Sequence, residues 1–268
     1  TYSANASVTL YPTWKATKGT FTVPSSVPAD GSTTATVTIT RYSTSYAHRE
    51  VVALGEHTQS FNGVATSVSF TIPTSWLSEI PTSTSKTGTV TVATFDGSDY
   101  IGSNVQSITI TVPSSVKPTV SLTGTNQSSN NTVNSWDTLV QGYSTIKLTA
   151  TASAGTGASV TSIVISGDGV SQSGTGTAAT SDLLTTAGSK TWKVVVTDSR
   201  GRKNQATLTR TVFEYFQPWI AISAFRSDSF GTEAPSDGTY ITATPRYGYA
   251  SCDGHNTPSV QKLEYKLK

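Results

Sequence analysis

Three histidines, abundant serines and sixteen acidic residues are the groups in this chain that could perform acid–base or nucleophilic chemistry. A Ser–His–Asp hydrolase needs a nucleophile beside a base, with an acid that orients the base. The chain has no G-x-S-x-G turn, which places the nucleophile in α/β-hydrolases. His48 lies in the strand-like run SYAHREVVAL, where we expect an exposed cross-strand residue, and we expect His57 and His255 to be structural as well.

Paired carboxylates are the second candidate, because glycosidases place two of them across one cleft. Asp96 and Asp99 flank one hairpin turn, and Asp168 stands between two glycines. Aspartate side chains stabilise tight turns of this kind. We therefore interpret these acids as turn residues and predict that the chain is not an enzyme.

The segment CDGHN brings together four potential metal ligands, Cys252, Asp253, His255 and Asn256. Structural zinc sites usually pair cysteines at short spacing, whereas Cys252 is the single cysteine of the chain. We interpret the segment as a loop whose turn is made by Asp253 and Gly254, and we expect no metal and no cofactor. A single cysteine also excludes a disulfide within the chain.

Aromatic side chains are the remaining candidates for ligand binding. Tyr247 and Tyr249 lie with Arg246 in the run PRYGYASCDGH, which we expect to be a loop. Because flat aromatic faces match sugar rings, we predict that these three residues bind glycan. A second aromatic cluster at residues 215–219 (YFQPW) falls at a domain junction, and we interpret it as a packing wedge.

The charge of the chain excludes two classes of partner. Charged residues make up only 13% of the chain and the net charge is +2, so a clustered basic face for nucleic acid is not expected. A polybasic membrane patch and an apolar run long enough to span a bilayer are missing as well. The hydrophobic content of 35% is low, but period-two alternation of Val, Ile and Thr favours half-buried strands over disorder.

Short strand-like runs with turn signals between them predict an all-β fold of tandem immunoglobulin-like antiparallel β-sandwich domains. The one helix expected is a single turn at residues 75–80, between Pro73 and Pro81. Without helices to make crossovers, the sheets should be antiparallel. The clearest runs are TATVTIT (34–40), TSVSFTI (66–72), TGTVTVAT (87–94), TIKLTATA (145–152) and KTWKVVVT (190–197).

Proline-bearing stretches divide the chain into three predicted regions. An N-terminal β-sandwich region covers 1–116, an immunoglobulin-like domain 117–213, and an incomplete further β domain 214–268. In the middle domain, Trp192 alternates in phase with Val194 and Val196, so we expect its side chain in the core. The final LEYKLK resembles a strand in progress and the chain has no methionine, so we expect it to be a piece of a longer protein.

Two stretches carry a family resemblance. Residues 67–118 contain Ile80-Pro81, a GTVTV run at 88–92, Ile101-Gly102 and VPSSVKP at 112–118; residues 194–240 contain DSRGR at 198–202, Tyr215, Pro218 and GTY at 238–240. In this order and spacing, the motifs resemble those of siphophage and prophage tail minor structural proteins, from phages of Gram-positive bacteria. The chain departs from that pattern at Gln217, where a second proline is usual, and at Ser227, where a cysteine is usual.

The resemblance implies a structural component of a bacteriophage tail (tail tip, fibre or minor tail protein) that contributes to host-surface attachment. It further implies a virion location, extracellular when assembled, with other tail proteins, copies of the same chain and host cell-wall glycan as partners. It brings no catalytic residue. A bacterial surface adhesin or stalk, and a non-catalytic cell-wall carbohydrate-binding segment, are the alternatives that the sequence leaves open.

Overall fold

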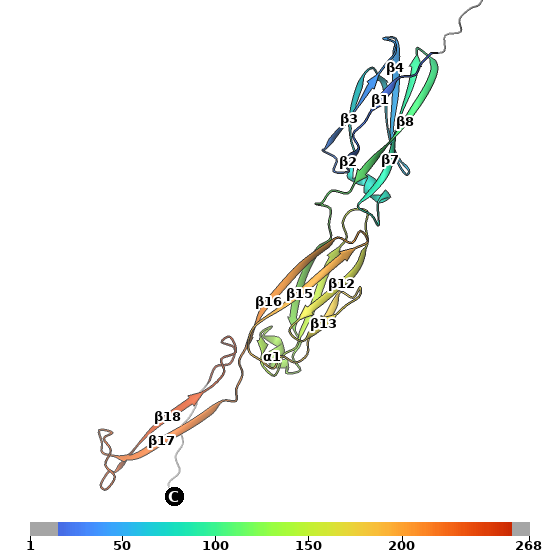
Figure 1. Ribbon diagram of the computed structural model, residues 1–268. Helices are drawn as coiled ribbons and strands as arrows, with labels where there is room; N and C mark the ends of the chain where they lie inside the picture. Colours follow the sequence, from blue (N-terminus) through green and yellow to red (C-terminus); the bar gives the residue numbers. More distant parts are fainter. Residues whose placement is uncertain (1–15, 259–268) are drawn as a thin grey trace, which may run out of the picture. The chain divides into compact units, whose positions relative to one another are not determined.

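The computed structural model describes residues 16–258, and nearly all of its regular structure is β-strand (Figure 1). The expected strand-like stretch before Thr20 lies largely outside these residues, and the LEYKLK strand lies wholly outside them. Residues 16–258 contain two short helices, the 3-10 helix η1 (Thr74–Glu79) and the α-helix α1 (Asn131–Ser135). The helical turn predicted between the two prolines is confirmed as η1, whereas α1 was not predicted.

The described chain forms two compact units. The first takes in the residues up to Pro118 together with Ala154–Ser159 and Asp198–Arg202, and the second takes in the remainder. Each unit is described by itself below. The domain boundaries proposed from the prolines stay predictions.

The first unit contains a three-stranded sheet in the order β1-β3-β6 and a five-stranded sheet in the order β2-β8-β7-β4-β5. Both sheets contribute side chains to one hydrophobic core, so they pack face to face. The strands are β1 (Thr20–Thr22), β2 (Ser26–Pro28), β3 (Thr34–Thr40), β4 (Tyr46–Leu54), β5 (His57–Val64), β6 (Ser67–Thr71), β7 (Ser85–Asp96) and β8 (Asp99–Thr111).

The second unit repeats this topology strand for strand. Its three-stranded sheet has the order β9-β11-β14 and its five-stranded sheet the order β10-β16-β15-β12-β13, around a core of its own. Each strand of the first unit therefore has a counterpart in the second unit whose strand number is higher by eight. The strands are β9 (Thr119–Asn126), β10 (Leu139–Val140), β11 (Ile146–Ser153), β12 (Val160–Gly167), β13 (Val170–Gln172), β14 (Ala178–Thr180), β15 (Gly188–Asp198) and β16 (Lys203–Phe213).

The expectation of purely antiparallel sheets is wrong at one pairing in each unit. β2 pairs with β8 in parallel, and β10 pairs with β16 in parallel. Parallel pairing without a helical crossover occurs here because each pair joins an early strand to the last strand of its unit. The intervening strands supply the long connection that a parallel pair needs.

Alternation of side chains explains which residues enter each core. β3 reads TATVTIT with the burial pattern exposed-buried throughout, so Ala35, Val37 and Ile39 face inward. In β15, Trp192 is fully buried and lies on the same face as Val194 and Val196, which confirms the prediction for this residue. The alternation of apolar and polar residues along the strands thus determines which residues form each core.

Two ionisable residues of β4 break this rule in the first unit. His48 and Glu50 occupy buried positions of β4, on the face that also carries Val52 and Leu54. The expectation that His48 would be an exposed cross-strand residue is therefore wrong, because alternation along β4 directs its ring into the core. Its Nδ1 donates to the carbonyl of Val64 at 3.1 Å.

A separate two-stranded ribbon follows in the second unit, formed by β17 (Trp219–Ser227) and β18 (Tyr240–Gly248). The strands pair antiparallel, from Trp219↔Gly248 to Ser227↔Tyr240. Most of its large apolar side chains are exposed.

Candidate functional site

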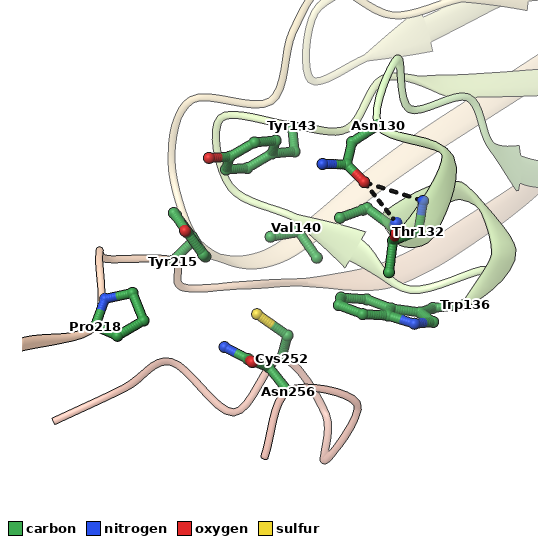
Figure 2. A pocket seen from close by; sticks show the side chains of 10 residues that line it. Asn130, Thr132, Trp136, Val140, Tyr143, Tyr215, Pro218, Cys252 and Asn256 are labelled. Carbon is green, nitrogen blue, oxygen red and sulfur yellow. Dashed lines mark hydrogen bonds between the residues drawn. The ribbon is translucent and has the colours of Figure 1, made fainter. Parts of the chain in front are cut away.

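A pocket of about 300 Å³ opens on the second unit, beside α1 (Figure 2). Three stretches of chain that are far apart in sequence, 130–143, 215–218 and 252–256, contribute to its walls. The lining residues are Asn130, Thr132, Val133, Trp136, Val140, Tyr143, Tyr215, Pro218, Cys252 and Asn256.

The α1 wall of the pocket is held by its own capping residue. Asn130 has extended backbone and its side-chain oxygen accepts from the backbone N–H groups of Thr132 (3.0 Å) and Val133 (3.1 Å). Asparagine is favoured at this position because it satisfies helix donors that have no partner within the helix. This cap orients the turn so that Val133 points into the unit and Trp136 lines the pocket.

Aromatic rings make up much of the pocket wall. Tyr143 and Tyr215 meet edge to face, with ring centroids 4.8 Å apart and planes at 81°. Trp136 stacks on His255, with centroids 5.1 Å apart and planes at 7°. A hydrogen bond with Tyr143 raises the pKa of the Tyr215 hydroxyl, so the Tyr215 hydroxyl stays neutral at physiological pH.

The floor of the pocket is the turn at residues 252–256 (CDGHN), the segment considered above as a possible metal site. Cys252, Asp253 and Gly254 all have left-handed backbone, with φ of 47°, 60° and 81°. The Asn256 side chain closes the turn by donating to the carbonyl of Ala250 at 2.8 Å. Turn chemistry therefore accounts for this run of residues.

The Cys252 side chain is buried against Val133, Val140 and Ala250. Burial raises the pKa of its thiol, which keeps the sulfur protonated and removes nucleophilic character. Within residues 16–258, no cluster of three or more His, Cys, Asp or Glu side chains could hold a metal ion.

The pocket has a neutral lining. None of the ten side chains that line it is acidic or basic. Amide, hydroxyl and ring groups therefore supply all of its polarity, and an ionic ligand would lose its hydration without gaining a counter-charge. The chemistry fits an uncharged, hydroxyl-rich ligand that can lie against aromatic rings and hydrogen-bond with amides.

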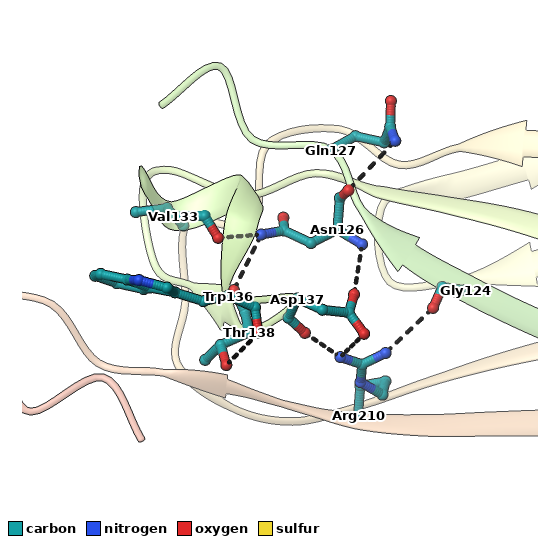
Figure 3. A network of polar contacts seen from close by, with 8 residues as sticks. All are labelled: Gly124, Asn126, Gln127, Val133, Trp136, Asp137, Thr138 and Arg210. Atoms are coloured by element: carbon teal, nitrogen blue, oxygen red, sulfur yellow. Dashed lines mark hydrogen bonds and ion pairs between the residues drawn. The ribbon is translucent and has the colours of Figure 1, made fainter. Parts of the chain in front are cut away.

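A polar network behind α1 fixes the wall of the pocket (Figure 3). The buried amide of Asn126 donates to the carbonyls of Val133 (2.9 Å) and Thr138 (3.1 Å). Arg210 donates to the carbonyl of Gly124 at 3.1 Å and lies 3.6 Å from the carboxylate of Asp137. The network connects the end of β9, the turn after α1 and β16, so it holds the backbone on either side of Trp136.

Replacing Asn126 with alanine should lower the free energy of unfolding of the second unit by about 1–3 kcal/mol, the cost of leaving buried hydrogen-bonding groups without a partner. Urea denaturation followed by circular dichroism measures this change. Gln127→Ala is the control, because Gln127 is exposed and should change stability by less than about 0.5 kcal/mol. Equal values for the two variants would contradict the role given to Asn126.

The three residues predicted to bind glycan lie outside this pocket. Tyr247 and Tyr249 are neighbours, with ring centroids 6.4 Å apart and planes at 21°. Arg246 pairs with Ala221 on the other face of the ribbon, so it does not join the two tyrosines. The expectation of a loop at this place is wrong for residues 245–248, which belong to β18. Glycan binding by these residues stays a prediction.

Other residues singled out in the sequence have structural contacts. His57 stacks on Trp76 with centroids 5.7 Å apart and lies 3.1 Å from the Ser78 hydroxyl. Of the YFQPW cluster, Tyr215 enters the pocket, while Phe216 and Trp219 are exposed. No helix among residues 16–258 combines the length and the apolar character that crossing a membrane requires.

Sequence reasoning missed the residues from the α1 side of the pocket. Asn130, Trp136 and Tyr143 lie in the long connection between β9 and β11, which carries no strand alternation of its own. A tryptophan next to an asparagine-rich stretch (QSSNNTVNSW, 127–136) was the available signal.

Comparison with known proteins gives one informative match. The family model described as "Siphovirus protein of unknown function (DUF859)" matches residues 20–233. No curated protein matches the chain. Among solved structures, dimeric latent PorU from Porphyromonas gingivalis aligns with 87% of this chain and 29% of that chain, at 9% identity and a TM-score of 0.22. That likeness carries no weight for fold or function. The family match spans well over half of the sequence, and the chain therefore belongs to this family of siphovirus proteins.

Proposed function

We propose that the chain is a structural component of the siphovirus tail (tail tip, fibre or minor tail protein) that contributes to attachment to the host surface. In this proposal its two-sheet units are immunoglobulin-like domains, and its partners are other tail proteins, further copies of the chain and host cell-wall glycan. Membership of a siphovirus family supports the viral setting.

The observation that carries the proposal is the eight-strand topology, which occurs twice in one siphovirus chain. Each unit has a hydrophobic core of its own, as independently folding domains do. A protein that holds other tail components apart needs such units. Its binding to partners then takes place on the loops of the units. In a particle with several copies, weak contacts of each chain add up through effective concentration.

Purified virions provide the test of location. Antibodies against residues 16–258 should label the tail in immunogold electron microscopy, and mass spectrometry of purified particles should detect the chain. Antibody depleted with the purified chain is the control. Failure to find the chain in infectious particles, while it is present in infected cells, would refute a virion role.

We propose further that the neutral aromatic pocket is the place where the chain contacts a saccharide. Sugars are uncharged, rich in hydroxyls and flat on one face, which matches a lining of rings, amides and hydroxyls without charge. The pair Tyr247 and Tyr249, at the end of β18, is a second location that the same experiment can distinguish.

Arrayed bacterial cell-wall polysaccharides provide the probe for binding, with the chain displayed in several copies. We expect Trp136→Ala to weaken binding by about tenfold, equivalent to about 1.4 kcal/mol for a lost aromatic contact. Asn134→Ala, in the same helix but outside the pocket lining, is the control. Full binding by Trp136→Ala together with loss in the Tyr247→Ala, Tyr249→Ala double variant would move the site to the tyrosine pair.

We also expect the chain to leave its ligand intact. Incubation with purified cell wall should release no sugar or peptide fragment above that of a heat-treated sample. Release of fragments would refute the proposal that the chain is not an enzyme.

A further inference from the structure

Two amide side chains that line the pocket beside α1 are each held in one orientation by hydrogen bonds. The side-chain oxygen of Asn130 accepts from the backbone N–H groups of Thr132 (3.0 Å) and Val133 (3.1 Å). An asparagine amide consists of one oxygen acceptor and one NH₂ donor, so the NH₂ group takes no part in these contacts. Figure 2 shows this nitrogen turned away from Thr132, on the side of Tyr143. Asn130 therefore supplies a hydrogen-bond donor for a ligand.

Asn256 is held in the opposite sense. Its side-chain nitrogen donates to the carbonyl of Ala250 at 2.8 Å, so its amide oxygen takes no part in this contact and remains an acceptor. Asn130 and Asn256 line the same pocket from distant stretches of the chain, and they lie on opposite sides of Val140 in Figure 2. The pocket thus has a donor on one wall and an acceptor on another.

An apolar part of the lining accompanies these two amides. Val133, Val140 and the thiol of Cys252 are buried and belong to one apolar cluster. Valine forms no side-chain hydrogen bond and a thiol forms only a weak one, so a sugar hydroxyl placed here would lose its water without a replacement. A methyl group placed here gains free energy by leaving water.

A secondary amide that ends in a methyl group matches all of these features. In its trans form the C=O and the N–H point in opposite directions. The C=O can therefore accept from Asn130 while the N–H donates to the oxygen of Asn256. The acetamido group of an N-acetylated amino sugar carries the C=O, the N–H and the methyl group on one ring carbon.

We infer that the ligand of this pocket is an N-acetylhexosamine, whose acetamido group binds to Asn130, to Asn256 and to the apolar cluster at Val140. This inference rests on the proposal that the pocket contacts a saccharide, and it names the class of that saccharide. Trp136 is half-buried and lines the same pocket, so its aromatic ring can contact the face of the sugar ring.

The size and the charge of the pocket agree with this ligand. Its volume of about 300 Å³ lies at the small end of the range of about 300–1,000 Å³ for ligand sites, which suits a single sugar residue. An amino sugar without its acetyl group carries an ammonium charge, and the lining has no acidic side chain that could pair with it. The pocket should therefore distinguish an acetylated amino sugar from a free one.

A peptide backbone also contains secondary amides, but it fits the pocket less well. The chain of a peptide continues on both sides of each amide, whereas the methyl group of an acetamido group is an end. Because Val133, Val140 and Cys252 are buried, they can receive a chain end more readily than a chain that runs past them.

Calorimetric titration of the 268-residue chain with matched sugar trimers tests the inference. The trimers consist of N-acetylglucosamine, of glucosamine or of glucose in the same linkage, so they differ only in the substituent on one ring carbon. The N-acetylglucosamine trimer should bind about tenfold or more tightly than the glucose trimer, because the latter lacks the amide hydrogen bonds and the methyl contact. The glucosamine trimer should bind most weakly of the three.

Asn130→Asp separates ligand binding from folding. Aspartate caps a helix as well as asparagine does, so α1 keeps its cap while an oxygen replaces the NH₂ donor. Binding of the N-acetylglucosamine trimer should weaken by about tenfold. Asn134→Asp is the matched control, because it makes the same change in α1 outside the pocket lining and keeps the oxygen that accepts from Ser128 at 3.2 Å. Its affinity should equal that of the wild type, and circular dichroism confirms the folding of both variants.

Equal affinity for the N-acetylglucosamine and glucose trimers, lowered for both by Trp136→Ala, would overturn the inference and leave the saccharide pocket in place. Affinity for none of the trimers would also overturn it, and the polysaccharide array described above would then decide separately whether the pocket binds any saccharide. Tighter binding of N-acetylalanine methylamide than of monomeric N-acetylglucosamine would overturn it as well, because the pocket would then recognise a peptide.

Discussion

Replacing Trp192 with alanine should lower the free energy of unfolding of the second unit by about 3–5 kcal/mol, as truncation of large aromatic residues in cores does. The side chain is fully buried among Val194, Val196 and the rest of the core. Its indole Nε1 donates to the carbonyl of Asp168 at 2.9 Å, so the substitution also leaves that carbonyl without its partner.

Chemical denaturation followed by far-ultraviolet circular dichroism measures this loss without relying on tryptophan fluorescence. Lys193→Ala is the matched control, because Lys193 is the next residue along β15 and its side chain is exposed. It should change stability by less than about 0.5 kcal/mol. A loss below about 1 kcal/mol for Trp192→Ala would contradict its place in the core.

The second large effect is expected at Glu50, whose stability contribution depends on pH. The side chain is fully buried, and neither of its carboxylate oxygens has a hydrogen-bond partner in the described part of the chain. Burial raises the pKa of Glu50 from its ordinary value of 4.5 to about 7. The folded state therefore holds the Glu50 proton more tightly than the unfolded state does.

The sign of the effect follows from this difference. Below pH 4.5 Glu50 is protonated in both the folded and the unfolded state, so its ionisation does not change the free energy of unfolding. As the pH rises from 4.5 to about 7, the unfolded chain loses this proton while the folded first unit keeps it, so the folded first unit loses stability. At about 1.4 kcal/mol for each pKa unit, the loss is about 3 kcal/mol above pH 7. Glu50→Gln, which cannot ionise, should therefore raise the free energy of unfolding by about 3 kcal/mol at pH 8 and by little at pH 4.5.

Denaturation curves at several pH values compare Glu50→Gln with the wild type and with Glu56→Gln. Glu56 is exposed at the turn after β4, so its replacement should leave the pH dependence unchanged. His48 lies on the same face of β4 and contacts the carbonyl of Val64. A Glu50→Gln variant with the stability of the wild type at pH 8 would show that the carboxylate is not buried.

The sequence predicted the parts of the fold that depend on local alternation. The run at 34–40 is β3 with the same limits, and the phase of Trp192 with Val194 and Val196 placed it correctly in the core. The helical turn between Pro73 and Pro81 was predictable because each proline restricts the chain beside it.

Other features depend on contacts between distant residues and could not be predicted in this way. The burial of His48 and Glu50 violates the rule that polar residues face water, so pattern alone assigned His48 to the surface. The run at 245–248 was expected to be a loop, but it pairs with the distant strand β17, where Pro245 lies opposite Ile222.

The pocket illustrates the same limit for function. Its walls come from α1, from β10, from Tyr215 and from the turn at Cys252. Spacing along the sequence carries no sign that Trp136 and Asn256 line one cavity. The tyrosine pair at Tyr247 and Tyr249 was identifiable because its members are neighbours in sequence.

The parallel pairing of β10 with β16 has a consequence for synthesis of the chain. Leu139 and Val212 meet across that pair, so the five-stranded sheet of the second unit cannot close until its eighth strand has left the ribosome. Such high contact order slows folding to the range of milliseconds to seconds. Because the first unit has the same closure between β2 and β8, folding during translation should advance in two discrete steps, one at the completion of each eighth strand, rather than continuously with chain length.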